Sequence, residues 1–124
     1  HVWLWALSGN EKLGPDTRSI LEDHHNLLYL SSVSSWEITI KWQLGKIELP
    51  EEPQVLVRNS LRDNHLRPLD ISHKHGCEVA SLPAHHKDPF DRLLIAQAQC
   101  ERLVLITADA EIMKYGPATH WAPR

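Results

Sequence analysis

The chain has 124 residues, of which 42% are apolar and 23% charged, so the sequence predicts one globular domain with a core of ordinary size. Its net charge of −3 and pI of about 6.3 argue against holding nucleic acid by bulk positive charge, so such a role would need a local basic patch or a metal ion. No apolar run is long enough to cross a bilayer and two cysteines make no disulfide framework, so we expect a cytoplasmic protein without membrane contact.

The first half of the chain predicts three helices and one strand. HVWLWAL (1–7) is expected to begin a helix, and residues 15–26 to form a second. LLYLSS (27–32) is a short apolar run that predicts a buried strand. SSWEITIKWQLGK (34–46) predicts a helix that ends at Gly45. Its apolar residues recur four apart, at Trp36, Ile40 and Leu44.

The second half alternates in the same way. Helices are expected over 53–64, 72–82, 89–103 and 108–116. Strands are expected over 65–70, 103–107 and, at a sheet edge, 119–122. Helices separated by short apolar strands favour an α/β domain with parallel strands and helical crossovers. In such an open sheet, ligands bind along the carboxyl edge.

Acidic residues stand near the expected helix starts: Glu37, Asp88, Asp91 and Asp109. One interpretation is helix capping. Ser34 and Glu37 have the spacing of a capping box, while Asp88, Pro89 and Asp91 fit N-cap, N1 and N3. Glu37 could also pair with Lys41 on the helix surface.

The other interpretation is a metal site. A cap needs one carboxylate, whereas DPFD (88–91) supplies two. Oxygen ligands without a nearby cysteine suit Mg²⁺ or Mn²⁺, and carboxylates that hold such ions are the usual means of activating water against a phosphodiester. A cation would also offset the phosphate charge that an acidic protein repels.

Three blocks resemble PIN-domain ribonucleases, in particular VapC-type toxins of toxin–antitoxin pairs. They are SSVSSWEITIKWQLGKIELP, LPAHHKDPFDRLLIAQAQ and LVLITADAEIMKYG, in order along most of the chain. The resemblance implies a three-layer PIN-like domain with a mostly parallel sheet and helices on both faces.

By the same resemblance, Glu37, Asp91 and Asp109 match catalytic, metal-binding acids. Four further residues match supporting positions: Asp88, the subgroup's extra aspartate; Thr107, which steadies the acids; and Lys41 and Arg92, basic neighbours of the site.

The resemblance departs at the start of the chain. Family members open with a short apolar strand that ends in a metal-binding aspartate, typically as Asp-Thr-His, whereas this sequence begins at His1. We therefore expect that strand and its aspartate directly upstream of His1. A protein without them should bind metal poorly and lose its central strand.

Histidines and tryptophans offer other binding chemistry. Nine histidines raise the alternative of a zinc site, but those that lie close in sequence (His24 and His25, His73 and His75, His85 and His86) stand adjacent or two apart instead of at helical ligand spacing. Solvated or capping roles are favoured, with His85 and His86 near RNA phosphates as an alternative. Tryptophans could stack on bases, but apolar helical patterns favour the core or an interface for Trp3, Trp5, Trp36 and Trp42.

The function implied is a Mg²⁺- or Mn²⁺-dependent endoribonuclease that acts as a toxin. Its expected partners are an RNA substrate, a cognate antitoxin protein and a second copy in a homodimer. Two alternatives stay open: a PIN-like nuclease of RNA processing or DNA flaps, and a non-catalytic binding module whose acids are caps.

Overall fold

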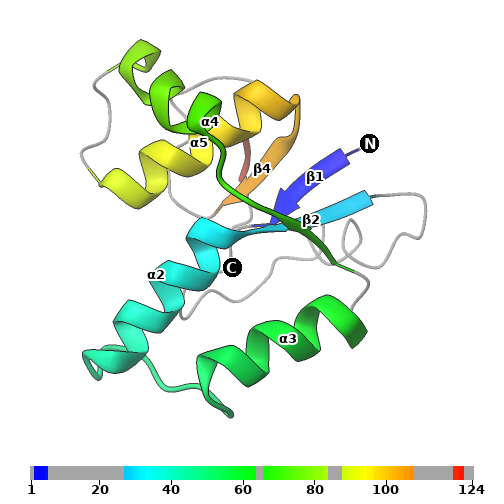
Figure 1. Ribbon diagram of the computed structural model, residues 1–124, viewed down its shortest axis with the longest axis vertical. Helices are drawn as coiled ribbons and strands as arrows, with labels where there is room; N and C mark the ends of the chain where they lie inside the picture. The colour runs from blue at the N-terminus through cyan, green and yellow to red at the C-terminus, as the bar shows by residue number, and fades with distance from the viewer. Residues whose placement is uncertain (1, 6–26, 64–65, 84–87, 108–118, 122–124) are drawn as a thin grey trace.

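The protein is a parallel α/β domain, seen in a computed structural model that describes residues 2–5, 27–63, 66–83, 88–107 and 119–121 (Figure 1). Its strands are β1 Val2–Trp5, β2 Leu27–Ser31, β3 Arg67–Leu69, β4 Val104–Thr107 and β5 Thr119–Trp121. They form one sheet in the order β3-β2-β1-β4-β5, and every pair is parallel. The predicted α/β class and the predicted edge strand are confirmed.

The helices follow the predicted order. They are α2 Ser32–Gln43, α3 Pro53–Asp63, α4 His73–Glu78, the 3-10 helix η1 Val79–Ser81, and α5 Pro89–Glu101. The helices expected over 15–26 and 108–116 fall outside the described residues. Within the described residues, no helix has the length and apolar character needed to span a membrane.

The central strand comes from the opening segment, and the helix predicted there is wrong for residues 2–5. Val2–Trp5 form β1, which pairs with Leu27–Leu30 on one side and, from Trp3 onward, with residues 104–106 on the other. Aromatic and β-branched side chains favour a pleated strand, and pairing on both sides overrides the helical reading of a short apolar run. The central position is thus filled by residues of this chain. The strand expected before His1 stays a prediction.

Helix α2 begins two residues earlier than predicted, and the face that it buries also differs from the predicted one. Ser31 is its N-cap and accepts a hydrogen bond from the Val33 N–H at 3.1 Å. The buried residues are Val33, Ser34, Glu37 and Ile38. The apolar residues predicted to face the core lie beside these buried residues. Two of them, Trp36 and Leu44, are 58% and 62% exposed. The core placement considered for Trp36 is therefore wrong.

The end of α2 is as predicted. Gly45 has φ of 72°, and the N–H groups of Gly45 and Lys46 donate to the carbonyls of Trp42 and Lys41. This pair of bonds is a Schellman motif, which satisfies the last carbonyls of the helix and favours glycine at the left-handed position.

Helix α5 supplies the largest share of the core. Its residues 94–98 are all buried, and four of them cluster with Val33 of α2 and Leu105 of β4. This packing fixes α5 against both the sheet and α2, so the first turns of α5 and α2 come together.

Candidate metal centre

Helices α2 and α5, which carry three of the candidate acids, are in contact. Helix α2 starts directly after β2, so its first turns lie at the carboxyl edge of the sheet. Helix α5 ends three residues before β4 begins, and its 13 residues reach about 20 Å back, which returns its first turn to the same edge. Figure 1 shows α2 and the start of α5 on neighbouring paths, and the two helices are in contact.

Three carboxylates converge at this junction. Oxygens of Glu37, Asp88 and Asp91 all lie within 4.8 Å of one another. Glu37 comes from α2, whereas Asp88 and Asp91 flank the first turn of α5, 51 and 54 residues further along the chain. The expected convergence of Glu37 and Asp91 is therefore present, and Asp88 joins them.

Asp88 is a helix cap, as the capping interpretation predicted. Its Oδ1 accepts hydrogen bonds from the N–H groups of Phe90 at 2.8 Å and Asp91 at 3.4 Å, with Pro89 in the first turn of α5. The two bonds hold Asp88 in one orientation at the start of the helix, where the dipole favours a negative charge. Capping uses Oδ1, so a second oxygen of the same carboxylate remains for another partner.

Glu37 is not a cap, and the predicted Ser34–Glu37 capping box is wrong. Ser31 caps α2, so Glu37 lies beyond its first turn, where no orphan N–H needs an acceptor. Glu37 is only 6% exposed, and Lys41 approaches its Oε2 at 3.2 Å. Burying a carboxylate beside two others, with one lysine as the countercharge that the structure records, costs free energy unless a further positive charge such as a metal ion compensates it.

Asp91 and Arg92 are neighbours in the first turn of α5 that contact different parts of the protein. Asp91 lies in the first turn of α5 and is half-buried within the carboxylate cluster. Arg92 donates to the carbonyl oxygens of Val79 at 3.1 Å and Pro83 at 3.2 Å. Arg92 thus ties α5 to the segment around η1. Lys41 contacts Glu37 of the cluster.

The remaining predicted residues are less fully described. Thr107 is the last residue of β4, where its backbone pairs with Trp121. Asp109, His85 and His86 lie outside the described residues.

Residues 1–116 of the sequence match the PIN domain family. The chain belongs to the PIN-domain family. A segment of 60 residues is also 38% identical to "Ribonuclease VapC16" of Mycobacterium tuberculosis. That segment is 48% of this chain and 43% of the ribonuclease, so the match spans less than half of the relative's length. The family predicted from the motif blocks is confirmed.

The acids of this PIN domain fit a hard divalent cation. All three donors are carboxylate oxygens, the type that Mg²⁺ and Mn²⁺ favour. At a Mg–O distance of about 2.0–2.1 Å, oxygens on opposite sides of one ion lie roughly 4.1 Å apart. A set confined within 4.8 Å therefore has the dimensions of one ion's surroundings.

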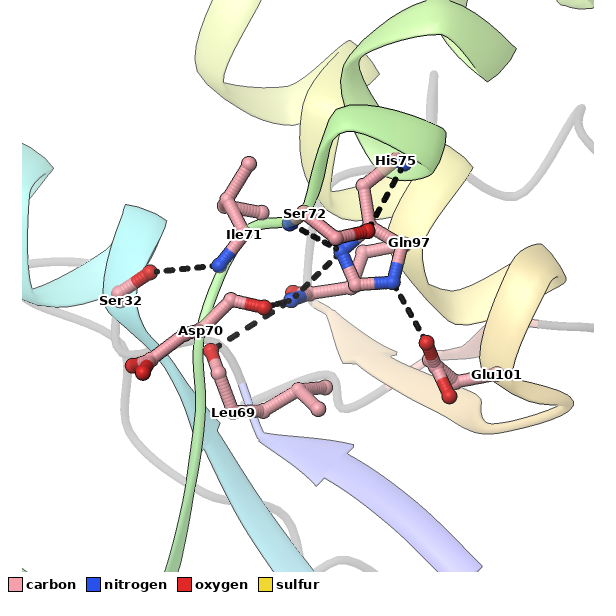
Figure 2. Close-up of polar contacts among 8 residues, drawn as sticks. All are labelled: Ser32, Leu69, Asp70, Ile71, Ser72, His75, Gln97 and Glu101. Atoms are coloured by element: carbon pink, nitrogen blue, oxygen red, sulfur yellow. Dashed lines mark hydrogen bonds and ion pairs between the residues drawn. The ribbon is translucent and has the colours of Figure 1, made fainter.

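A polar tether that the sequence did not reveal aligns the two helices of the site (Figure 2). The segment after β3 is bound on both sides. The Ile71 N–H donates to Ser32 Oγ at the start of α2, and Gln97 Nε2 of α5 donates to the carbonyls of Leu69 and Asp70. The same short segment therefore holds α2 and α5 in register, and so the acids they carry.

His75 extends this tether into α4 (Figure 2). It is 2% exposed, and its Nδ1 accepts the Ser72 N–H at 3.0 Å while Ser72 Oγ accepts the His75 N–H. Because Nδ1 is an acceptor, the ring hydrogen sits on Nε2, which lies 2.6 Å from Glu101 Oε1. The expectation of a capping histidine is right here, but this one is buried instead of solvated.

Proposed function

We propose that this PIN domain is a Mg²⁺- or Mn²⁺-dependent endoribonuclease that cleaves RNA phosphodiester bonds as the toxin of a toxin–antitoxin pair. The observation that carries the proposal is the convergence of Glu37, Asp88 and Asp91 from two helices within 4.8 Å. Family membership and the local likeness to a ribonuclease support it.

Glu37, Asp88 and Asp91 would hold the cation, with Asp109 as a further ligand implied by the family pattern. When bound, the cation supplies positive charge that lowers the pKa of a coordinated water and offsets the charge of the phosphodiester. The chain supplies the orientation. Asp88 is fixed through its capping oxygen, and Glu37 through its pair with Lys41.

The geometry of Glu37 favours this proposal over a binding module whose acids are all caps. Capping explains Asp88 and suits Asp91, but it leaves the most buried of the three acids without a structural purpose. A cation would compensate the charges of all three at once.

The remaining parts of the proposal come from the family. We expect a cognate antitoxin protein, assembly as a homodimer, and action on RNA in the cytoplasm. Expression of the complete protein should arrest growth, and co-expression of the adjacent antitoxin gene should relieve the arrest. Arrest that persists unchanged in an Asp91→Asn variant would contradict a nuclease toxin.

Cleavage of a labelled single-stranded RNA by the complete purified protein tests the nuclease directly. We expect cleavage with Mn²⁺, none with a chelator, and loss of cleavage in Asp91→Asn, which keeps the side chain's shape but removes its charge. Asp70→Asn is the matched control, because Asp70 is exposed and outside the cluster. Cleavage by Asp91→Asn at the wild-type rate would sink the proposal.

A further inference from the structure

An exposed tryptophan stands beside the carboxylate cluster. Trp36 directly precedes Glu37 on α2 and is 58% exposed, although Glu37 itself is only 6% exposed. Tryptophan is normally well buried in proteins, so an exposed tryptophan beside a cluster of carboxylates indicates a binding surface.

The orientation of Trp36 is set by the same junction that assembles the acids. Its ring contacts that of Phe90 edge to face, with centroids 5.0 Å apart and planes at 78°. Phe90 lies between Asp88 and Asp91 in the sequence and packs against the core. The aromatic contact and the carboxylate cluster are therefore both formed between α2 and the start of α5, next to each other.

We propose that Trp36 is a stacking platform for one nucleobase of the RNA, and that Phe90 positions it. This inference rests on the proposed ribonuclease function. A nucleotide joins an anionic phosphate to a flat base, and the junction offers a matching pair: an acid cluster suited to a cation, with an indole beside it.

Stacking on an aromatic ring is sequence-tolerant, because every base has a π-face. Bases inside a duplex cannot lie flat on an exposed side chain, whereas unpaired bases in loops and single strands can. The platform therefore selects for unpaired RNA near the scissile phosphate instead of for a particular base.

The competing occupant of this face is a second protein surface. Leu44 stands two turns along α2 from Trp36 and is 62% exposed, so an apolar row could pack against another copy. The contact with Phe90, which places Trp36 beside the acids at one end of that row, favours RNA.

The test measures the Kd of the complete protein for a fluorescent single-stranded RNA by anisotropy in the presence of Mn²⁺. The RNA carries a cleavage-resistant backbone, so the readout does not depend on cleavage while the acid cluster keeps its cation. One stacked base corresponds to roughly 5- to 150-fold in affinity, which is the weakening expected for Trp36→Ala. Trp36→Phe keeps a ring and should retain most of the affinity. Trp42→Ala is the matched control, since Trp42 is 39% exposed on the same helix.

A second arm separates stacking from a general effect on the fold. In a series of RNAs with one abasic nucleotide each, the wild type should lose affinity at one position, and Trp36→Ala should be insensitive at that position. Equal weakening of every RNA would overturn the proposal, as would wild-type affinity in Trp36→Ala. Dimer dissociation by both Trp36→Ala and Leu44→Ala, with RNA affinity unchanged, would assign the face to a second copy. RNA that is cleaved normally by Trp36→Ala refutes the platform alone, whereas a wild type that neither binds nor cleaves RNA refutes the proposed function as well.

Discussion

Replacing Glu37 by Gln should stabilise the metal-free protein. The substitution keeps the side chain's size and removes one of three negative charges that lie within 4.8 Å of one another. At that separation two carboxylates repel by about 3.5 kcal/mol at an effective dielectric constant of about 20, and by about 0.9 kcal/mol in water. Glu37 has two such neighbours.

The pair with Lys41 opposes this repulsion. At 3.2 Å it contributes about 5.2 kcal/mol of attraction at the same dielectric constant of about 20 and about 1.3 kcal/mol in water, before screening of the partly exposed lysine. The repulsion exceeds the attraction at either limit, so we expect Glu37→Gln to gain about 0.5–2 kcal/mol. In a chain of this size, that corresponds to a rise in Tm of roughly 2–8 °C.

The assay is thermal unfolding of the complete protein in a chelator and again with excess Mn²⁺. Ligand at about 100 times its Kd stabilises the native state by about 2.7 kcal/mol, a gain that the wild type should show and Glu37→Gln should largely lack. Glu48→Gln, at an exposed position outside the cluster, is the control. A lower Tm for Glu37→Gln than for the wild type in chelator would refute the reasoning and make Glu37 a structural partner of Lys41.

Three further predictions concern the scaffold. Removing the N-cap of α2 with Ser31→Ala should cost about 0.5–2 kcal/mol in urea unfolding, because one buried N–H loses its acceptor; no change would contradict the cap. His75→Phe fills the ring's space but cannot accept the hydrogen bond of the part-buried Ser72 N–H, so the free energy of unfolding should fall by about 1–3 kcal/mol in urea unfolding. The exposed control His73→Phe should be nearly neutral, and an equal loss in both variants would contradict the role of the His75 ring. Burial raises the pKa of the Cys100 thiol, so at pH 8 a thiol reagent should modify the exposed Cys77 first, and the Cys100 rate should climb only at higher pH; faster reaction at Cys100 would contradict this.

Local patterns sufficed for the elements with one unambiguous signal. The strand at 104–107 is a continuous apolar run, and α5 has Pro89 and Asp88 at its start with strong helix formers behind them. Capping chemistry and burial point to the same structure there, so the prediction holds.

The errors arose where short-range signals were ambiguous. Ser31 and Ser34 can both cap a helix by residue type, and only the observed helix start shows that Ser31 does. The spacing of Trp36, Ile40 and Leu44 predicted one apolar face of α2, whereas the buried residues are Val33, Ser34, Glu37 and Ile38. Val2–Trp5 is an apolar run that is too short to distinguish a helix from a strand, and its pairing with β2 and β4 decides the matter from a distance.

The sequence predicted which residue types form the site, but not which acid caps a helix and which does not. The sequence grouped Glu37, Asp88 and Asp91 as caps or ligands together. The structure separates them, because only the observed helix starts show that Asp88 caps α5 and that Glu37 caps nothing. The tether through Gln97 could not be foreseen, since its partners are backbone carbonyls 27 and 28 residues away.

Binding of Mn²⁺ to the complete protein tests the central claim most directly, with free Mn²⁺ followed by electron paramagnetic resonance during a titration. The clustered carboxylates predict saturable uptake by the wild type, and binding at least about tenfold weaker in Asp91→Asn, the range typical when a metal site loses a supporting group. No saturable uptake by the wild type, or undiminished uptake by Asp91→Asn, would contradict the account and leave these acids as architecture.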